Sequence, residues 1–174
     1  GDLTKEEYWR MQDTDWFRVV HEQVARDLPC PTSIDVVIPS YTRWDPKDGR
    51  QWPKAHTARG GGGMALFGSG AFFTWPSNLN DVVRAFSDAT PMDRARVCDD
   101  SAGRGVCWAN ASTGIGATLH EIGHNFGLMH GGGTYAIMTR GIDHFARAFM
   151  TIEPPCNRHR ESIAVKDDEI GLWS

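Results

Sequence analysis

The first thirty residues repeat apolar side chains with the period of a helix. Four apolar residues recur at intervals of four, and a fifth is the direct neighbour of the first. On a helix these five side chains share one face. They are Trp16, Phe17, Val20, Val24 and Leu28. Thr4 followed three residues later by Glu7 is typical of a capping box, and the prolines at 29 and 31 cannot continue a helix. The pattern predicts one helix that begins after Thr4 and ends before Pro29.

Two later segments have the character of strands. Residues 34–38 form a short β-branched run, which predicts a core strand. Residues 65–75 are apolar and aromatic but are interrupted by glycines, which predicts a strand with a bulge or two short strands. Between these segments, residues 41–54 contain two prolines and an Asp-Gly pair and are predicted to be a loop.

The segment 65–75 has two open roles. It is either plain core sheet or an edge strand beside a binding cleft. In the second role, the backbone of Leu66, Phe67 and Gly68 would pair with an extended peptide, because a glycine leaves no Cβ in the way of another backbone. The sequence leaves both alternatives open.

Two more helices are expected in the middle of the chain. Residues 79–89 fit a short amphipathic helix with Ser77 or Asn78 as its cap. A longer helix follows, with Ser112 or Thr113 as a plausible N-cap. Its core-facing stripe is predicted to consist of Ile115, Leu119, Ile122 and Phe126.

The polar face of this longer helix carries the pattern H-E-x-x-H-x-x-G-x-x-H. His120 and His124 lie about 40° apart on a helix, so both imidazoles can reach one metal ion. Gly127 can adopt the left-handed conformation that ends the helix and swings His130 back to the same ion. Three protein ligands leave a fourth position for water, which is typical of a catalytic Zn²⁺ site. Glu121 lies at the edge of the same face, where it can touch that water.

The H-E-x-x-H-x-x-G-x-x-H pattern resembles the zinc site of metzincin metallopeptidases, and this resemblance implies a zinc-dependent endopeptidase. Zinc would lower the pKa of the bound water, and Glu121 would accept its proton as general base and deliver it to the leaving amine. Two other readings stay open. One is a zinc-containing recognition module without turnover, against which the presence of Glu121 argues, and the other is a zinc hydrolase of a non-peptide bond. His21, His56 and His159 lack ligand spacing and are expected to be surface or structural residues.

Other residues near the motif have less specific roles. Gly116 and Gly123 are poor helix formers, which predicts close approach of a neighbouring backbone. Residues 140–149 are charged and aromatic and are expected to begin another helix. Asp143 or His144 is either a hydrogen-bond partner of a ligand histidine or, as is more common, part of a local salt bridge.

Size, charge and composition narrow the class of protein. The 174 residues suffice for one domain with a real core. A net charge of −4 without a basic run makes nucleic acid an unsuitable partner, and no apolar run reaches the roughly 18 residues of a membrane span. The chain starts without an initiator Met or a signal peptide, which indicates a processed or excised form and leaves targeting open.

The four cysteines allow three pairings. We favour disulfides over reduced thiols, with Cys98 joined to Cys107 across a polar loop, which leaves Cys30 for Cys156. Such disulfides favour a secreted protein slightly over a cytoplasmic one. Zinc binding by these cysteines is disfavoured because no C-x-x-C pair is present.

The motifs together resemble those of one branch of the metzincin zinc metallopeptidases, some of which carry a jacalin-like lectin domain. The resemblance rests on the zinc motif and on flanking segments, which are residues 60–63, 65–70, 74–76, 137–141 and 143–149. It implies that Met138 lies on the tight turn, called the Met-turn, that metzincins place beneath the three histidines. Any lectin domain would lie outside this chain.

The resemblance also implies the fold. We expect an α/β (α+β) zincin with a twisted mixed sheet, a long active-site helix and a small irregular C-terminal subdomain. Residues 1–127 would form the N-terminal subdomain and residues 128–174 the C-terminal one, with the cleft between them. The expected partner is a protein or peptide substrate, without nucleic acid and without a membrane span.

Overall fold

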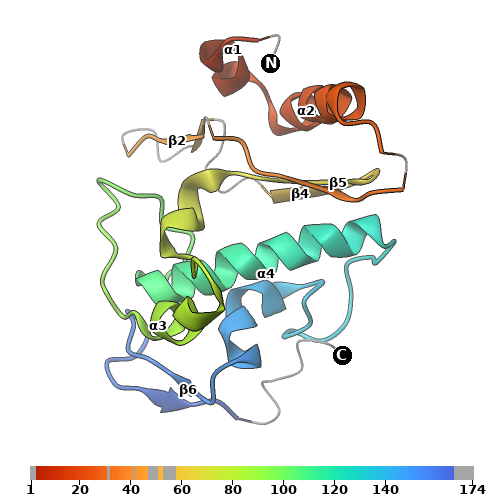
Figure 1. Ribbon diagram of the computed structural model, residues 1–174. Coiled ribbons are helices and arrows are strands. Elements are labelled where there is room, and N and C mark those ends of the chain that lie inside the picture. Colours follow the sequence, from red (N-terminus) through yellow and green to blue (C-terminus); the bar gives the residue numbers. More distant parts are fainter. Residues whose placement is uncertain (1–2, 31, 41, 47–50, 53–57, 167–174) are drawn as a thin grey trace.

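The chain folds as layers around one long helix (Figure 1). The computed structural model describes residues 3–30, 32–40, 42–46, 51–52 and 58–166. Helices α1 and α2 lie on one side of a small sheet, and the long helix α4 (Cys107–Asn125) lies on the other side. Helix α3 (Val82–Ser87), the 3-10 segment η3 (Arg140–Ala148) and a short hairpin lie beneath α4. This mixed arrangement of helices and sheets agrees with the expected α+β class.

The N-terminal apolar stripe forms two helices where one was predicted. The capping box is confirmed, since Thr4 and Glu7 bond each other's backbone at the start of α1 (Lys5–Arg10). The chain is then extended at Met11 and Gln12, and α2 runs over Asp13–Asp27. The break lets both helices bury side chains against the sheet. The buried cluster there consists of Tyr8, Trp16, Val20, Met64 and Leu66.

The main sheet has the strand order β1-β5-β4. β1 (Asp35–Val37) confirms the predicted strand and pairs in parallel with β5 (Met64–Phe67), but it is an outer strand with Val36 exposed and not a core strand. β4 (Ala58–Gly61) pairs antiparallel with the other side of β5 through a glycine hairpin. Residues 41–54 are not all loop, because β2 (Arg43–Trp44) and β3 (Gln51–Trp52) form a small antiparallel pair.

The edge-strand prediction for residues 65–75 is wrong. β5 is the central strand, its neighbours pair with both of its sides, and all four of its residues are buried. Leu66 and Phe67 therefore have no free backbone edge for a peptide. Gly68 caps the 3-10 helix η1 (Ser69–Thr74), which replaces the predicted second half of the strand. The hairpin at residues 61–63 places β4 next to β5 on the outside of the sheet. The edge strand is therefore β4, which precedes the predicted segment in the chain.

The two middle helices differ from the predictions at their starts and on their surfaces. η2 (Leu79–Asp81) and α3 (Val82–Ser87) form the expected short helical segment, with Asn78 as the cap. Leu79 and Val83 are exposed, so only part of this amphipathic segment faces the core. α4 begins at Cys107, well before the predicted cap at Ser112, which is fully buried inside the helix. The Ser112 hydroxyl donates to the Asp143 carbonyl and so has a partner that periodicity does not reveal.

The apolar stripe of α4 is covered only in its first part. Ile115 and Leu119 pack against the second buried cluster of the protein. Its buried members are Phe86, Val106, Trp108, Ala109, Ala111, Phe145, Ala146 and Cys156. Phe126, in contrast, is 70% exposed. Together with Ile122 it lines an apolar cavity of about 410 Å³ and is not a core residue.

The C-terminal part packs along α4. η3 (Arg140–Ala148) is a 3-10 segment where the start of a helix was expected, and β6 (Ile152–Glu153) pairs with β7 (Ile163–Ala164). Gly116 confirms its predicted role, because a Cβ there would overlap the Ile142 backbone. No helix among the described residues is long and apolar enough to cross a membrane.

Neither predicted disulfide is present, because all four cysteines are free thiols. The loop after Cys98 is held instead by hydrogen bonds. Ser101 donates to the Asp99 carboxylate and accepts from the Gly105 amide, and Asn110 accepts from the Asp100 amide. The argument for a secreted protein that rested on disulfides therefore has no support.

Candidate metal centre

The end of α4 brings the third histidine of the motif back to the first two. Gly127 has φ +77°, as predicted for the residue that ends this helix. Its amide donates to the His124 carbonyl, and the Leu128 amide donates to the Gly123 carbonyl, both at 3.1 Å. This pair of bonds is a Schellman motif, which caps the helix and reverses the chain. His130 thereby returns to α4 although it lies outside the helix.

The three imidazoles converge on one point. The Nε2 atoms of His120 and His124 are 3.1 Å apart, and the same distance separates those of His120 and His130. In a tetrahedral zinc site, nitrogen ligands about 2.0–2.1 Å from the ion lie roughly 3.4 Å from one another. Among the described residues, these three form the only cluster of His, Cys, Asp or Glu with metal-ligand spacing.

Hydrogen bonds at the other ring nitrogens favour metal binding. His120 Nδ1 lies 2.9 Å from the Ile137 carbonyl, and His124 Nδ1 lies 2.9 Å from the Leu128 carbonyl. A carbonyl only accepts, so each Nδ1 carries the proton in the neutral ring. The two Nε2 atoms then face each other with lone pairs, an arrangement that a cation stabilises. The histidines therefore fit a bound Zn²⁺.

The sequence left open whether Asp143 or His144 is the hydrogen-bond partner of a histidine of the motif. The rings of His120 and His124 are oriented by the backbone of Ile137 and Leu128, and neither Asp143 nor His144 is bonded to them. Asp143 instead pairs with Arg140, and His144 lies 3.9 Å from the Glu153 carboxylate. Asp143 thus takes the local salt-bridge role that the sequence left as an alternative, and His144 lies near a carboxylate and away from the three histidines.

Met138 packs against the zinc-motif helix. It is buried, and its Sδ lies 2.7 Å from the position that a Cβ on Gly123 would occupy. Gly123 directly precedes His124, so the methionine lies against the turn of α4 that carries His120 and His124. The close neighbour of Gly123 is this side chain, whereas the sequence predicted a backbone.

Glu121 lies beside the histidines on α4, where β4 crosses the helix. A Cβ on Gly60 would overlap the Glu121 carbonyl, so the backbones of β4 and α4 are in direct contact there. The side chain of Glu121 is partly buried. β4 was not predicted to be a strand, because its glycines resemble a flexible linker and show no apolar periodicity.

The other predicted histidines lie away from this centre. His21 bonds the Gly62 carbonyl and His159 contacts the Glu161 carbonyl, so both are structural as expected. His56 lies outside the described residues. Asn125, the residue after the second ligand, makes three hydrogen bonds that no sequence pattern indicated.

Comparison with known proteins identifies the class. A family model described as "Putative peptidase family" matches residues 2–173. A "Putative zinc metalloproteinase" of Schizosaccharomyces pombe is 38% identical over 163 residues, which cover 91% of this chain and 26% of that protein. A protein of the same description from Saccharomyces cerevisiae is 35% identical over 116 residues, which cover 64% of this chain and 16% of that protein. No solved structure matches the chain.

The histidine cluster agrees with the descriptions of the family and of these relatives. The chain belongs to the peptidase family whose model it matches over nearly its whole length. It spans about a quarter of the length of the first relative and less of the second.

Proposed function

We propose that this chain is the catalytic unit of a zinc-dependent endopeptidase of the metzincin type. The observation that carries the proposal is the convergence of three histidine Nε2 atoms, with neighbouring pairs 3.1 Å apart. His120, His124 and His130 would hold the ion, and Met138 would form the floor beneath them as the Met-turn. Gly127 supplies the reversal that makes the third ligand available.

The chemistry divides between the ion and the protein. When bound, zinc supplies a Lewis acid that polarises a carbonyl and lowers the pKa of water. Glu121 accepts the proton of the attacking water and then delivers it to the nitrogen of the leaving amine. The carbonyls of Ile137 and Leu128 keep the ligand rings in the tautomer that leaves Nε2 free.

The free side of β4 is the surface that we propose for the substrate. β4 is an outer strand, and no strand among the described residues pairs with its outer side. Its backbone touches α4 at Glu121. An extended peptide that pairs with β4 would therefore lie next to the general base, and main-chain pairing would accept many sequences.

The test is cleavage of denatured casein by the zinc-loaded chain, with and without a chelator. Glu121→Gln should retain zinc and lose at least about 10²-fold in rate, the lower range for loss of a general base. Glu22→Gln, on the exposed face of α2, is the matched control and should cleave like the parent. Zinc binding without cleavage of casein by the parent chain would refute the proposed endopeptidase.

A further inference from the structure

The hairpin that joins β4 to β5 has no side chain of its own to hold it in place. Its turn consists of Gly61, Gly62 and Gly63, with φ values of +135°, +62° and +91°. Glycine adopts these angles readily but loses much conformational freedom when it does so. Neighbouring elements must therefore fix the turn.

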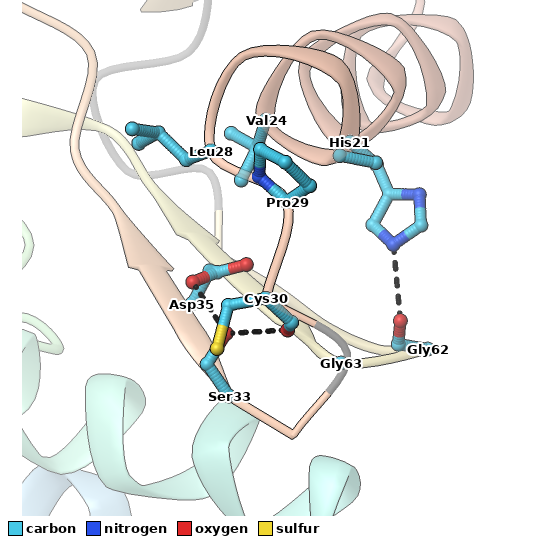
Figure 2. A pocket seen from close by; sticks show the side chains of 10 residues that line it. His21, Val24, Leu28, Pro29, Cys30, Ser33, Asp35, Gly62 and Gly63 are labelled. Carbon is cyan, nitrogen blue, oxygen red and sulfur yellow. Dashed lines mark hydrogen bonds between the residues drawn. The ribbon is translucent and has the colours of Figure 1, made fainter.

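One neighbour is α2. His21 Nε2 lies 3.0 Å from the Gly62 carbonyl, to which it donates (Figure 2). Phe17 stacks on the His21 ring, and the guanidinium of Arg59, from β4, lies over Phe17. These contacts hold the hairpin from the side that faces away from α4.

A second neighbour is β1, whose Asp35 amide donates to the Gly63 carbonyl at 2.8 Å, and a third is the last residue of α4. Asn125 Oδ1 accepts from the Gly63 amide at 2.9 Å, and Nδ2 donates to the Met64 carbonyl at 3.1 Å. The side-chain amide thus bonds one donor and one acceptor of the hairpin backbone, as a peptide group of a further strand would. Nδ2 also donates to the Glu121 carbonyl at 3.1 Å.

Both the Asn125 side chain and the β4 backbone therefore contact the Glu121 carbonyl. Asn125 bonds it, and the Gly60 backbone lies so close to it that no Cβ would fit between them. Asn125 and Gly60 together place the hairpin directly on the turn of α4 that carries Glu121. A shift of the hairpin would alter the distance between the outer side of β4 and the general base.

We propose that Asn125 is a positioning residue, which fixes the substrate-binding side of β4 relative to Glu121 and the three histidines. This inference rests on the proposed function. It adds a separate claim, that one amide side chain sets the geometry between the peptide-binding strand and the metal centre.

The first test measures the hairpin directly, without catalysis. In Asn125→Ala, we expect the Gly63 amide and the amides of residues 58–61 to exchange hydrogen at least about tenfold faster, because the loss of several hydrogen bonds opens the hairpin. Zinc content should equal that of the parent. Asn78→Ala, which removes a cap far along the chain at η2, is the matched control and should leave hairpin exchange unchanged.

The second test separates positioning from stability. Asn125→Ala should lower kcat/KM about 10- to 100-fold for a long extended peptide. A short substrate with the same scissile bond, which does not reach along β4, should lose less than about threefold. A loss of stability alone would lower kcat/KM equally for the long and the short substrate. Asn78→Ala, which also removes a stabilising hydrogen bond, should show the same equal loss.

Gly60→Ala provides an independent route if Asn125→Ala does not fold. Its Cβ forces β4 away from Glu121, so the same selective loss on the long peptide is expected, with zinc retained. Gly133→Ala, where a Cβ meets open space, is its control.

Unchanged hairpin exchange in Asn125→Ala, or equal losses on long and short substrates in both variants, would overturn the proposal. If the parent cleaves nothing, the proposed function fails while hydrogen exchange still decides the role of Asn125.

Discussion

Glu153 provides a quantitative test of how the C-terminal part is held together. Its carboxylate is buried on β6 and accepts from Arg147 Nε at 2.8 Å. His144 and His159 each approach it to 3.9 Å. Burial alone would raise the pKa of Glu153, but His144, Arg147 and Arg104 outweigh burial and lower this pKa to about 2, from an ordinary value of 4.5.

The perturbation is Glu153→Gln. Because the pKa of Glu153 is lower in the folded state, the charged carboxylate stabilises the fold above about pH 4.5, and this stability is lost as the pH falls toward 2. A difference of 2.5 pKa units corresponds to about 3 kcal/mol. Removal of one partner from a buried ion pair costs about 3–5 kcal/mol, which agrees. We therefore expect Glu153→Gln to lower the free energy of unfolding by about 3 kcal/mol at pH 7.

Urea unfolding of the metal-free chain measures this difference without a contribution from metal binding. Between pH 7 and pH 3, protonation of Glu153 should reduce the gap between parent and variant by about 2 kcal/mol. Glu22→Gln, which breaks an exposed pair with Arg18 on α2, should change stability little at either pH. A cost below about 1 kcal/mol at pH 7, or a gap that does not change with pH, would refute the reasoning.

Three further predictions concern the metal, the packing of α4 and the cysteines. His124→Ala should lose most bound zinc in a metal analysis, and full retention would contradict the ligand assignment. Gly116→Ala should lower the free energy of unfolding by about 1–3 kcal/mol, because its Cβ overlaps the Ile142 backbone; an unchanged urea midpoint would show that this contact is absent. In the native chain, an alkylating reagent should label exposed Cys30, whose thiol pKa is lowered by hydrogen bonds from Ser33 and Thr32. Cys98 should stay unlabelled until unfolding, because burial raises the pKa of its thiol; a disulfide-linked peptide would contradict the free thiols.

Burial of polar residues explains why the start of α4 was misplaced. Ser112 and Asn110 are fully buried, and hydrogen-bonding residues are ordinarily expected near helix ends or at the surface. Ser112 donates to the Asp143 carbonyl and accepts from the Ala146 amide. Asn110 donates to Thr74 and accepts from the Asp100 amide. These partners lie 10 to 36 residues away along the chain, so only the folded structure shows that the positions are satisfied.

Short-range features of this protein could be predicted from its sequence alone. The capping box at Thr4, the strand at residues 34–38 and the left-handed turn at Gly127 depend on neighbours within a few residues. The convergence of His120 and His124 follows from the helical repeat. The spacing of the motif therefore predicted the histidine cluster that the structure contains.

Long-range features needed the tertiary structure. Which strand is at the edge depends on pairing between residues far apart, and β4 rather than β5 takes that place because the glycine hairpin turns it outward. Asn125 bonds Gly63 and Met64, which lie more than 60 positions earlier in the chain, so its role has no local signature. The four cysteines are free thiols, and the loop between Cys98 and Cys107 is held by hydrogen bonds instead of a disulfide. Local patterns determine turns and ligand spacing, whereas edges, partners and burial depend on which distant segments meet when the chain folds.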